Sequence, residues 1–116
     1  MKYKLKYSPD ARDKLREIKK QIALFHGNQL ATKIVSKIMG NIRDLQNNPE
    51  KGTSVEALLG IPTSYRFLHI EHNYVFYKFQ ENTVFVTDIY NEKENFMWKI
   101  FGINLRTQDS IDFWGE

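Results

Sequence analysis

The sequence predicts an α+β fold in which an N-terminal strand and an antiparallel helical hairpin pack on an antiparallel sheet, in the order β-α-α-β-β-β-α. Three observations predict it. Lysines alternate with apolar residues over residues 2–7, apolar residues recur every three or four positions over residues 11–45, and three runs of aromatic and β-branched residues lie between 65 and 90. Helical and strand segments fall in separate runs, which is typical of the α+β class.

The length and composition of the chain suit a single domain over residues 1–116, with residues 103–116 as a C-terminal extension. The sequence has no cysteine, which excludes a disulfide framework, cysteine-ligated metals and thiol catalysis. Residues 1–11 are charged and alternating, and no apolar run is long enough to cross a bilayer. We therefore expect a cytoplasmic protein with no secretory signal and no membrane partner.

Charge is distributed unevenly along the chain. Residues 1–51 carry 12 lysines and arginines against 5 aspartates and glutamates, a net charge of +7, and residues 52–116 carry 5 against 9, a net charge of −4. Such asymmetry indicates an anionic partner for the first half, which could be nucleic acid, a ribosome or an acidic protein segment. The alternative interpretation is a solvated helix face that has no partner.

Residues 2–7 predict a strand at a sheet edge, because its lysines form one solvated face. Ser8, Pro9 and Asp10 then form a helix start signal. Serine caps free N–H groups, proline suits the first helical position, and aspartate favours the positive end of the helix dipole. Gly27 marks the end of this helix. Its apolar stripe consists of Ala11, Leu15, Ile18, Ile22 and Phe25.

A second helix is predicted after Asn28, which can cap it, and before Pro49, since the residue that precedes a proline avoids the helical region. The short connection predicts that the two helices form an antiparallel hairpin. Residues 50–63 indicate a loop, in which a short turn with Val55, Leu58 and Leu59 fills a gap in the core. The apolar stripe of the second helix consists of Ala31, Ile34, Ile38, Ile42 and Leu45.

Three strands are predicted at residues 65–70, 74–79 and 83–90, and their short connections favour a β-meander. The central strand is apolar on both sides, so we expect it in mid-sheet with the hairpin packed on one face. Residues 94–100 predict a last short helix that ends at Gly102. The tail that follows is expected to fold back on the domain or to dock on a partner, because it carries Ile103, Leu105, Ile111, Phe113 and Trp114.

The order of elements and three local patterns resemble the RelE/ParE family of toxins from bacterial type II toxin–antitoxin systems. The family's strand-to-helix opening is similar to SPDARDKLREI, and the exit from the second helix in its ParE branch is similar to LQNNPEKG. The family's three-strand core is similar to SYRFLHIEHNYVFYKFQENTVFVTDIYNEKEN, with Tyr65-Arg66 at its start, Phe76-Tyr77-Lys78 in the central strand and Gln80-Glu81-Asn82 at an acidic turn. The resemblance covers residues 2–101 and leaves the tail outside it.

Departures from the family pattern bring the chain nearer its ParE branch. RelE-type members cut messenger RNA in the ribosome with arginines and lysines, whereas ParE-type members inhibit DNA gyrase without RNA-cleaving chemistry. The arginine that usually precedes the central strand is missing from His72-Asn73-Tyr74, and Asn91-Glu92-Lys93 stands where the family often has His-x-Arg. The resemblance therefore implies a growth-arresting toxin that inhibits gyrase and is neutralised by a cognate antitoxin. A homodimer or a hetero-oligomer with that antitoxin is compatible with it.

Two other hypotheses stay open. A RelE-like, ribosome-dependent endoribonuclease would use Arg66, Lys93 and His69 as catalytic residues. RNA cleavage needs a proton acceptor for the 2′-hydroxyl, a donor for the leaving oxygen and a group that stabilises the phosphorane charge, for which arginine is well suited. The second hypothesis is a decayed, non-toxic relative that binds an antitoxin and little else. Whether the chain is an enzyme depends on which hypothesis holds.

The candidate catalytic residues also have structural interpretations. Arg66 could instead pair with a carboxylate, such as Glu71 or Asp88, because buried or half-buried arginines are usually paired. His69 and His72 flank a turn and need not converge on one site. No cluster of histidines and carboxylates has the spacing of a metal site, and no glycine-rich phosphate loop is present. We therefore expect neither a metal nor a cofactor.

Residues that could contact the target or another anion combine the basic first half with the proposed sheet. Lysines and arginines attract phosphates without specificity, and tyrosines can stack on bases. The same tyrosines alternate along strands, where aromatic residues more often belong to the core. The hairpin and the sheet are expected to form a groove for an acidic, amphipathic antitoxin segment. The candidate contact residues are Lys4, Arg12, Lys19, Lys20, Arg66, Tyr77 and Lys78.

Overall fold

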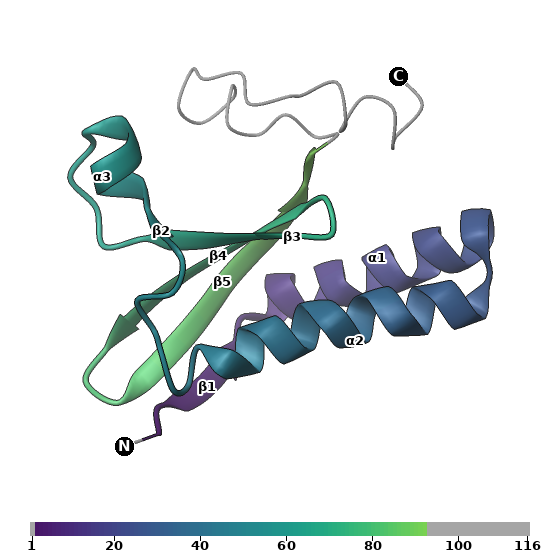
Figure 1. Ribbon diagram of the computed structural model, residues 1–116, viewed down its shortest axis with the longest axis horizontal. Helices are drawn as coiled ribbons and strands as arrows, with labels where there is room; N and C mark the ends of the chain where they lie inside the picture. The colour runs from purple at the N-terminus through teal and green to yellow at the C-terminus, as the bar shows by residue number, and fades with distance from the viewer. Residues whose placement is uncertain (1, 93–116) are drawn as a thin grey trace.

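A computed structural model describes residues 2–92 of the chain, and Figure 1 shows how their elements are arranged. A helical hairpin lies along one face of a twisted sheet, and a short helix lies at the opposite end of the molecule from the hairpin's connection. In chain order the elements are β1 (Lys4–Tyr7), α1 (Pro9–His26), α2 (Asn28–Asp44), β2 (Thr53–Ser54), α3 (Val55–Leu59), β3 (Arg66–Ile70), β4 (Asn73–Gln80) and β5 (Thr83–Asn91).

Within the described residues, the strands form one five-stranded sheet in the order β1-β5-β4-β3-β2. The predicted meander is confirmed, because β3, β4 and β5 pair antiparallel in sequence. The sheet as a whole is mixed, because β1 pairs parallel with β5, from Lys4 opposite Thr83 to Tyr7 opposite Val86. The sequence pattern of β1 specifies its solvated face and its place at an edge, but it contains no signal for the direction of its partner.

The start of α1 forms as its sequence predicts. The hydroxyl of Ser8 accepts a hydrogen bond from the backbone N–H of Ala11 at 3.0 Å, and it donates one to the carbonyl of Thr87 at 2.6 Å. The cap residue therefore also fastens α1 to β5. Gly27, with φ of 93°, separates α1 from α2, and its N–H bonds to the carbonyl of Ala23. This conformation is one that glycine adopts at little cost.

The hairpin packs on one face of the sheet, which we call the hairpin face. The core there joins the stripes of both helices to β3, β4 and β5, and it contains Ala11, Leu15, Ile38, Ile42, Leu45, Leu68, Ile70, Val75, Tyr77, Val84, Val86 and Ile89. Of the other predicted stripe residues, Ile18 and Ile34 pack against this core, Ile22 and Ala31 are buried outside it, and Phe25 is not covered. Phe25 is 76% exposed, because the last turn of α1 extends beyond the part of the helix that packs on the sheet.

The opposite side of the sheet, which we call the far face, has a smaller core around α3. Val55 is buried there against Phe67, Tyr74 and Phe76. The segment predicted as a loop thus contains a two-residue strand and a short helix, capped by the Ser54 hydroxyl. The prediction that this segment fills a gap in the core is confirmed for Val55, which is buried. It is wrong for Leu58, which is 50% exposed.

The helix predicted at residues 94–100 and the extension at residues 103–116 lie outside the described residues. Among the helices that the structure does describe, none combines the length and the apolar character needed to cross a membrane.

Candidate functional site

Arg66, the arginine expected to contact phosphate, lies at the start of β3 and binds the backbone. Its Nη1 donates to the carbonyl oxygen of Gly52 at 2.9 Å and to that of Glu50 at 3.4 Å. The prediction that Arg66 pairs with the carboxylate of Glu71 or Asp88 is wrong. Glu71 instead forms an ion pair with Lys37, in which Nζ lies 2.6 Å from Oε1. The Oδ1 atom of Asp88 accepts a hydrogen bond from the backbone N–H of Ile89. Arg66 therefore holds the loop that precedes β2 against the sheet.

Tyr77 is fully buried, which is incompatible with the expected contact to a target. Its side chain points to the hairpin face at the centre of β4, because Val75 and Tyr77 share the alternation that fills the larger core. Its hydroxyl accepts a hydrogen bond from Gly52 and donates one to the carbonyl of Pro49. Burial is the main cause that raises the pKa of Tyr77 above its ordinary value of 10.0. Tyr77 is thus a core residue with a satisfied hydroxyl.

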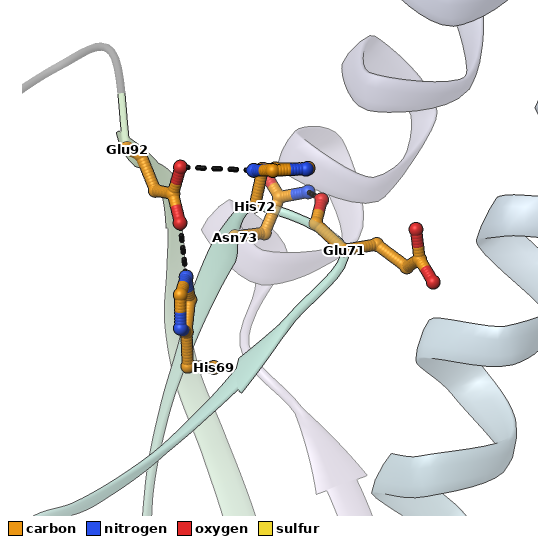
Figure 2. A network of polar contacts seen from close by, with 5 residues as sticks. All are labelled: His69, Glu71, His72, Asn73 and Glu92. Atoms are coloured by element: carbon orange, nitrogen blue, oxygen red, sulfur yellow. Dashed lines mark hydrogen bonds and ion pairs between the residues drawn. The ribbon is translucent and has the colours of Figure 1, made fainter. Parts of the chain in front are cut away.

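The two histidines at the β3–β4 turn converge on one carboxylate, contrary to the expectation that they need not meet. Figure 2 shows His69 and His72 approaching the two oxygens of Glu92 from β3 and from the turn. His69 contacts one oxygen through Nε2, and His72 Nδ1 lies 3.0 Å from the other. The Glu92 side chain is only 6% exposed. In the same figure Glu71 points away from this cluster.

Strand register explains why Glu92 reaches this cluster. His69 pairs with Tyr74, Tyr74 pairs with Tyr90, and Glu92 follows Tyr90 by two residues, so it lies on the same side of the sheet. The ring of His69 stacks on that of Tyr74 with centroids 4.6 Å apart. The sequence holds no short motif for this arrangement, and only the pairing of the three strands could have located it.

The turn itself aims His72 at Glu92. Glu71 and His72 have φ of 48° and 64°, which are left-handed values. Two successive residues with positive φ form the tight turn that matches the twist of a hairpin. The backbone N–H of Glu92 also donates to the carbonyl of His72 at 3.0 Å. The end of β5 is therefore fastened to the turn by backbone and side-chain contacts together.

The proposed catalytic residues are not brought together in the part of the chain that the structure describes. Arg66 and His69 are three residues apart on one strand, so their side chains lie on opposite faces of the sheet and about 10 Å apart along it. Leu68, which lies between them, packs in the core of the hairpin face, whereas Phe67 packs on the far face. The third candidate, Lys93, lies outside the described residues.

The far face carries an open apolar groove of about 560 Å³ between α3 and β5. Its walls come from the segment after α3 and from the sheet, and include Ile61, Tyr65, Phe76 and Tyr90. A second hollow of about 450 Å³ adjoins it at the β1 edge, and Thr87 lines both. The two together form one continuous hollowed surface, which is mostly apolar in the groove and partly polar and cationic in the second hollow.

Lysines flank this surface. Lys6 and Lys78 both line the second hollow and lie on either side of Phe85 in one cross-strand row. The ammonium of Lys78 lies 5.6 Å from the centre of the Tyr65 ring. Lys4 alternates with the residues of β1 that pack in the larger core, so it lies on the far face as well.

Apart from Arg66, the basic residues expected to contact a target therefore divide into two groups. Lys4 and Lys78 lie on the far face, where Lys78 lines the hollow that adjoins the apolar groove. Arg12, Lys19 and Lys20 are exposed on α1, on the helical hairpin that covers the other face. Long cationic side chains on an exposed helix attract anions, but by themselves they do not select one.

Comparisons with known proteins add a family and a fold. A model of the family described as "ParE toxin of type II toxin-antitoxin system, parDE" matches residues 5–96. Among solved structures, the chain is similar to one from the "Chromosomal ParDE TA system from P. aeruginosa", with 20% sequence identity and a TM-score of 0.65. The similar region covers 77% of this chain and 95% of that chain. No curated protein matches the sequence.

Proposed function

Because this chain belongs to the ParE toxin family of type II toxin–antitoxin systems, we propose that it arrests bacterial growth by binding and inhibiting DNA gyrase. We also propose that a cognate antitoxin neutralises it. In this proposal the toxin breaks no bond itself. It acts through the surface that it presents to the target, and its action is lost when the antitoxin covers that surface.

One observation carries the proposal of a binding mechanism. The two described residues that a RelE-like nuclease would use, Arg66 and His69, lie on opposite faces of the sheet. Each is also engaged by the protein, Arg66 by carbonyl oxygens and His69 by Glu92. A nuclease must direct its charge-stabilising group and its proton-transfer group at one phosphate. This pair cannot do so without rearrangement of β3, and a binding mechanism needs no such pair.

The far face supports the proposal of an antitoxin partner. Its groove has an apolar floor with Phe76 and Tyr90 and carries Asp88 in its lining, and Lys6 and Lys78 line the hollow that adjoins it. An acidic, amphipathic segment would bury its apolar side chains on this floor and direct its carboxylates to the lysines. This is the same chemistry that the basic first half of the sequence indicates.

Controlled expression in a bacterium tests the proposed function, with DNA breakage and messenger RNA cleavage measured in the same cultures. DNA breaks, an SOS response and intact messages are expected. The Arg66→Ala variant separates the two mechanisms. Ribosome-phased cuts in messages that disappear in Arg66→Ala would contradict gyrase inhibition and identify a nuclease. Absence of growth arrest in a strain that lacks the antitoxin would contradict toxicity itself.

Co-expression tests the second half of the proposal. The protein encoded by the neighbouring small open reading frame is expected to restore growth and to co-purify with the toxin. A Lys6→Glu/Lys78→Glu variant is expected to weaken that complex, because it places two carboxylates beside an acidic segment. Unchanged affinity in this variant would remove the far face as the antitoxin surface.

A further inference from the structure

The tip of the helical hairpin exposes large apolar side chains that the domain does not cover. Leu24 is 78% exposed and Phe25 is 76% exposed, and Leu30 at the start of α2 is 39% exposed. All residues from 24 to 30 are exposed. We define these three side chains as the tip patch. Figure 1 shows the α1–α2 connection at one end of the molecule, at the right of the view, away from β1 and α3.

Phe25 continues the buried stripe of α1 past the end of the core. It follows Ile22, which is buried, by three positions and Ile18, which packs against the larger core, by seven, so it lies on the same side of the helix as these residues. An apolar residue in register with a buried stripe, but beyond the core, is what a surface completed by another protein requires.

The charge around the tip patch limits what can cover it. Residues 18–43 contain four lysines and one arginine and no aspartate or glutamate. Lys37 on α2 pairs with Glu71 in the β3–β4 turn, whereas Lys19, Lys20 and Lys33 are exposed on the turns that lead to the tip. A second copy of the chain would bring like charges together around the patch, which disfavours self-association. An acidic partner is favoured for the same reason.

Shape distinguishes the target from the antitoxin. The tip is a convex end of two helices, and a convex apolar end is buried by insertion into a hollow of a folded protein. A flexible antitoxin segment instead lies in a groove, and the far face supplies one. We propose that the tip patch is the surface that docks into an apolar hollow with an acidic rim on the target, which under the proposed function is gyrase. This inference rests on that proposed function.

The test measures inhibition of supercoiling by purified gyrase with the full-length toxin. The Leu24→Ser/Phe25→Ser variant is expected to need a roughly 30-fold higher concentration for half-inhibition, since central apolar contacts dominate binding energy in interfaces. Leu58→Ser is the matched control, because Leu58 is also exposed but lies on α3. It is expected to inhibit like the wild type. The conservative Leu24→Met/Phe25→Leu variant is expected to retain most of the inhibition.

Three controls make the result specific. The melting temperature of Leu24→Ser/Phe25→Ser is expected to stay close to that of the wild type, because these side chains are exposed. Its affinity for the antitoxin and its sedimentation behaviour are also expected to stay unchanged. Loss of antitoxin binding, conversion of a dimer to a monomer, or release from vesicles of anionic lipid would each assign the patch to another occupant and overturn the inference.

The proposed function and this inference fail in different ways. If the wild type does not inhibit gyrase, the proposed function is contradicted and the docking inference falls with it. If the wild type inhibits gyrase and Leu24→Ser/Phe25→Ser inhibits it equally well, only the docking inference is overturned.

Discussion

The hydroxyl of Tyr77 lies 2.8 Å from the backbone nitrogen of Gly52, whose hydrogen bond it accepts, and this contact joins the central strand to the loop that follows the hairpin. The same hydroxyl donates to the carbonyl of Pro49 at 2.7 Å. Arg66 binds the carbonyl of Gly52 from the neighbouring strand. The loop before β2 is therefore held at three backbone atoms, the carbonyl oxygen of Pro49 and the nitrogen and carbonyl oxygen of Gly52, next to the start of α3.

Tyr77→Phe removes the hydroxyl and leaves two buried backbone groups without this partner. An expected loss of about 1–3 kcal/mol in the free energy of unfolding follows, because an unsatisfied buried donor or acceptor costs that much. Denaturant unfolding measures the loss. Tyr65→Phe is the control, since Tyr65 is exposed, and its expected effect is within about 0.5 kcal/mol. Equal stability of the two variants would show that the hydroxyl of Tyr77 contributes nothing.

Gly52→Ala is expected to destabilise the fold because no space exists for a methyl group. A Cβ atom at Gly52 would lie 2.5 Å from the Tyr77 hydroxyl oxygen and 2.8 Å from the backbone oxygen of Phe67. Overpacking of this kind costs about 1–3 kcal/mol or more, as thermal unfolding would measure.

Gly40→Ala is the matched control for this substitution. Its Cβ would have only the end of the Arg43 side chain within 4 Å, at 3.8 Å. Because Gly40 lies inside α2, alanine is expected to stabilise the fold by about 0.5–1 kcal/mol. A stable Gly52→Ala variant would contradict the close approach of Tyr77.

Alkaline pH is expected to weaken the fold. Burial is the main cause that raises the pKa values of Tyr7, Tyr74 and Tyr77 above 10.0. The tyrosines of the unfolded chain therefore lose their protons at a lower pH than those of the folded chain. At alkaline pH the unfolded state binds fewer protons than the folded state, and the free energy of unfolding falls as pH rises. The contribution is complete below pH 10.0 and is lost as pH rises through the folded values. Unfolding experiments between about pH 9 and pH 11 measure the slope, which Tyr77→Phe is expected to reduce. A slope identical in both proteins would exclude Tyr77 as a contributor.

Glu92→Ala is expected to loosen the end of β5. Glu92 is buried and binds His69 and His72, so its removal leaves both imidazoles without this acceptor. Because His69 is 48% exposed and can bond to water instead, the expected cost is about 0.5–1.5 kcal/mol. Hydrogen exchange would detect the change as faster exchange at the backbone N–H of Glu92, which bonds to His72. Glu17→Ala on the exposed side of α1 is the control, and its exchange pattern is expected to match the wild type. Unchanged protection in Glu92→Ala would mean that the backbone contacts alone hold the strand.

Local sequence signals located the elements of this fold well. Ser8 and Pro9 start α1, Gly27 separates the two helices, and alternation within β3, β4 and β5 gives the correct meander. These features depend on neighbours in sequence, such as a cap three residues away or a residue on the same side of a strand. For that reason a single sequence suffices to predict them.

Features that depend on long-range pairing could not be predicted in the same way. The parallel pairing of β1 with β5 joins residues about 80 positions apart. The contact of His69 with Glu92 depends on the registers of three strands, and the exposure of Phe25 depends on where the packed core ends beneath a regular helix. The predicted site differs from the structure for the same reason. Tyr77 and Arg66 were predicted to contact a target at the surface, but they bind the backbone of the loop before β2.

The most direct test of the binding mechanism compares two purified systems with the same preparation of toxin. One contains gyrase and relaxed plasmid, and the other contains translating ribosomes and messenger RNA. Inhibited supercoiling in the first and uncut messages in the second are the expected results, and addition of the antitoxin should restore supercoiling. Codon-phased cleavage of messages with normal supercoiling would contradict the binding mechanism and identify a ribosome-dependent nuclease.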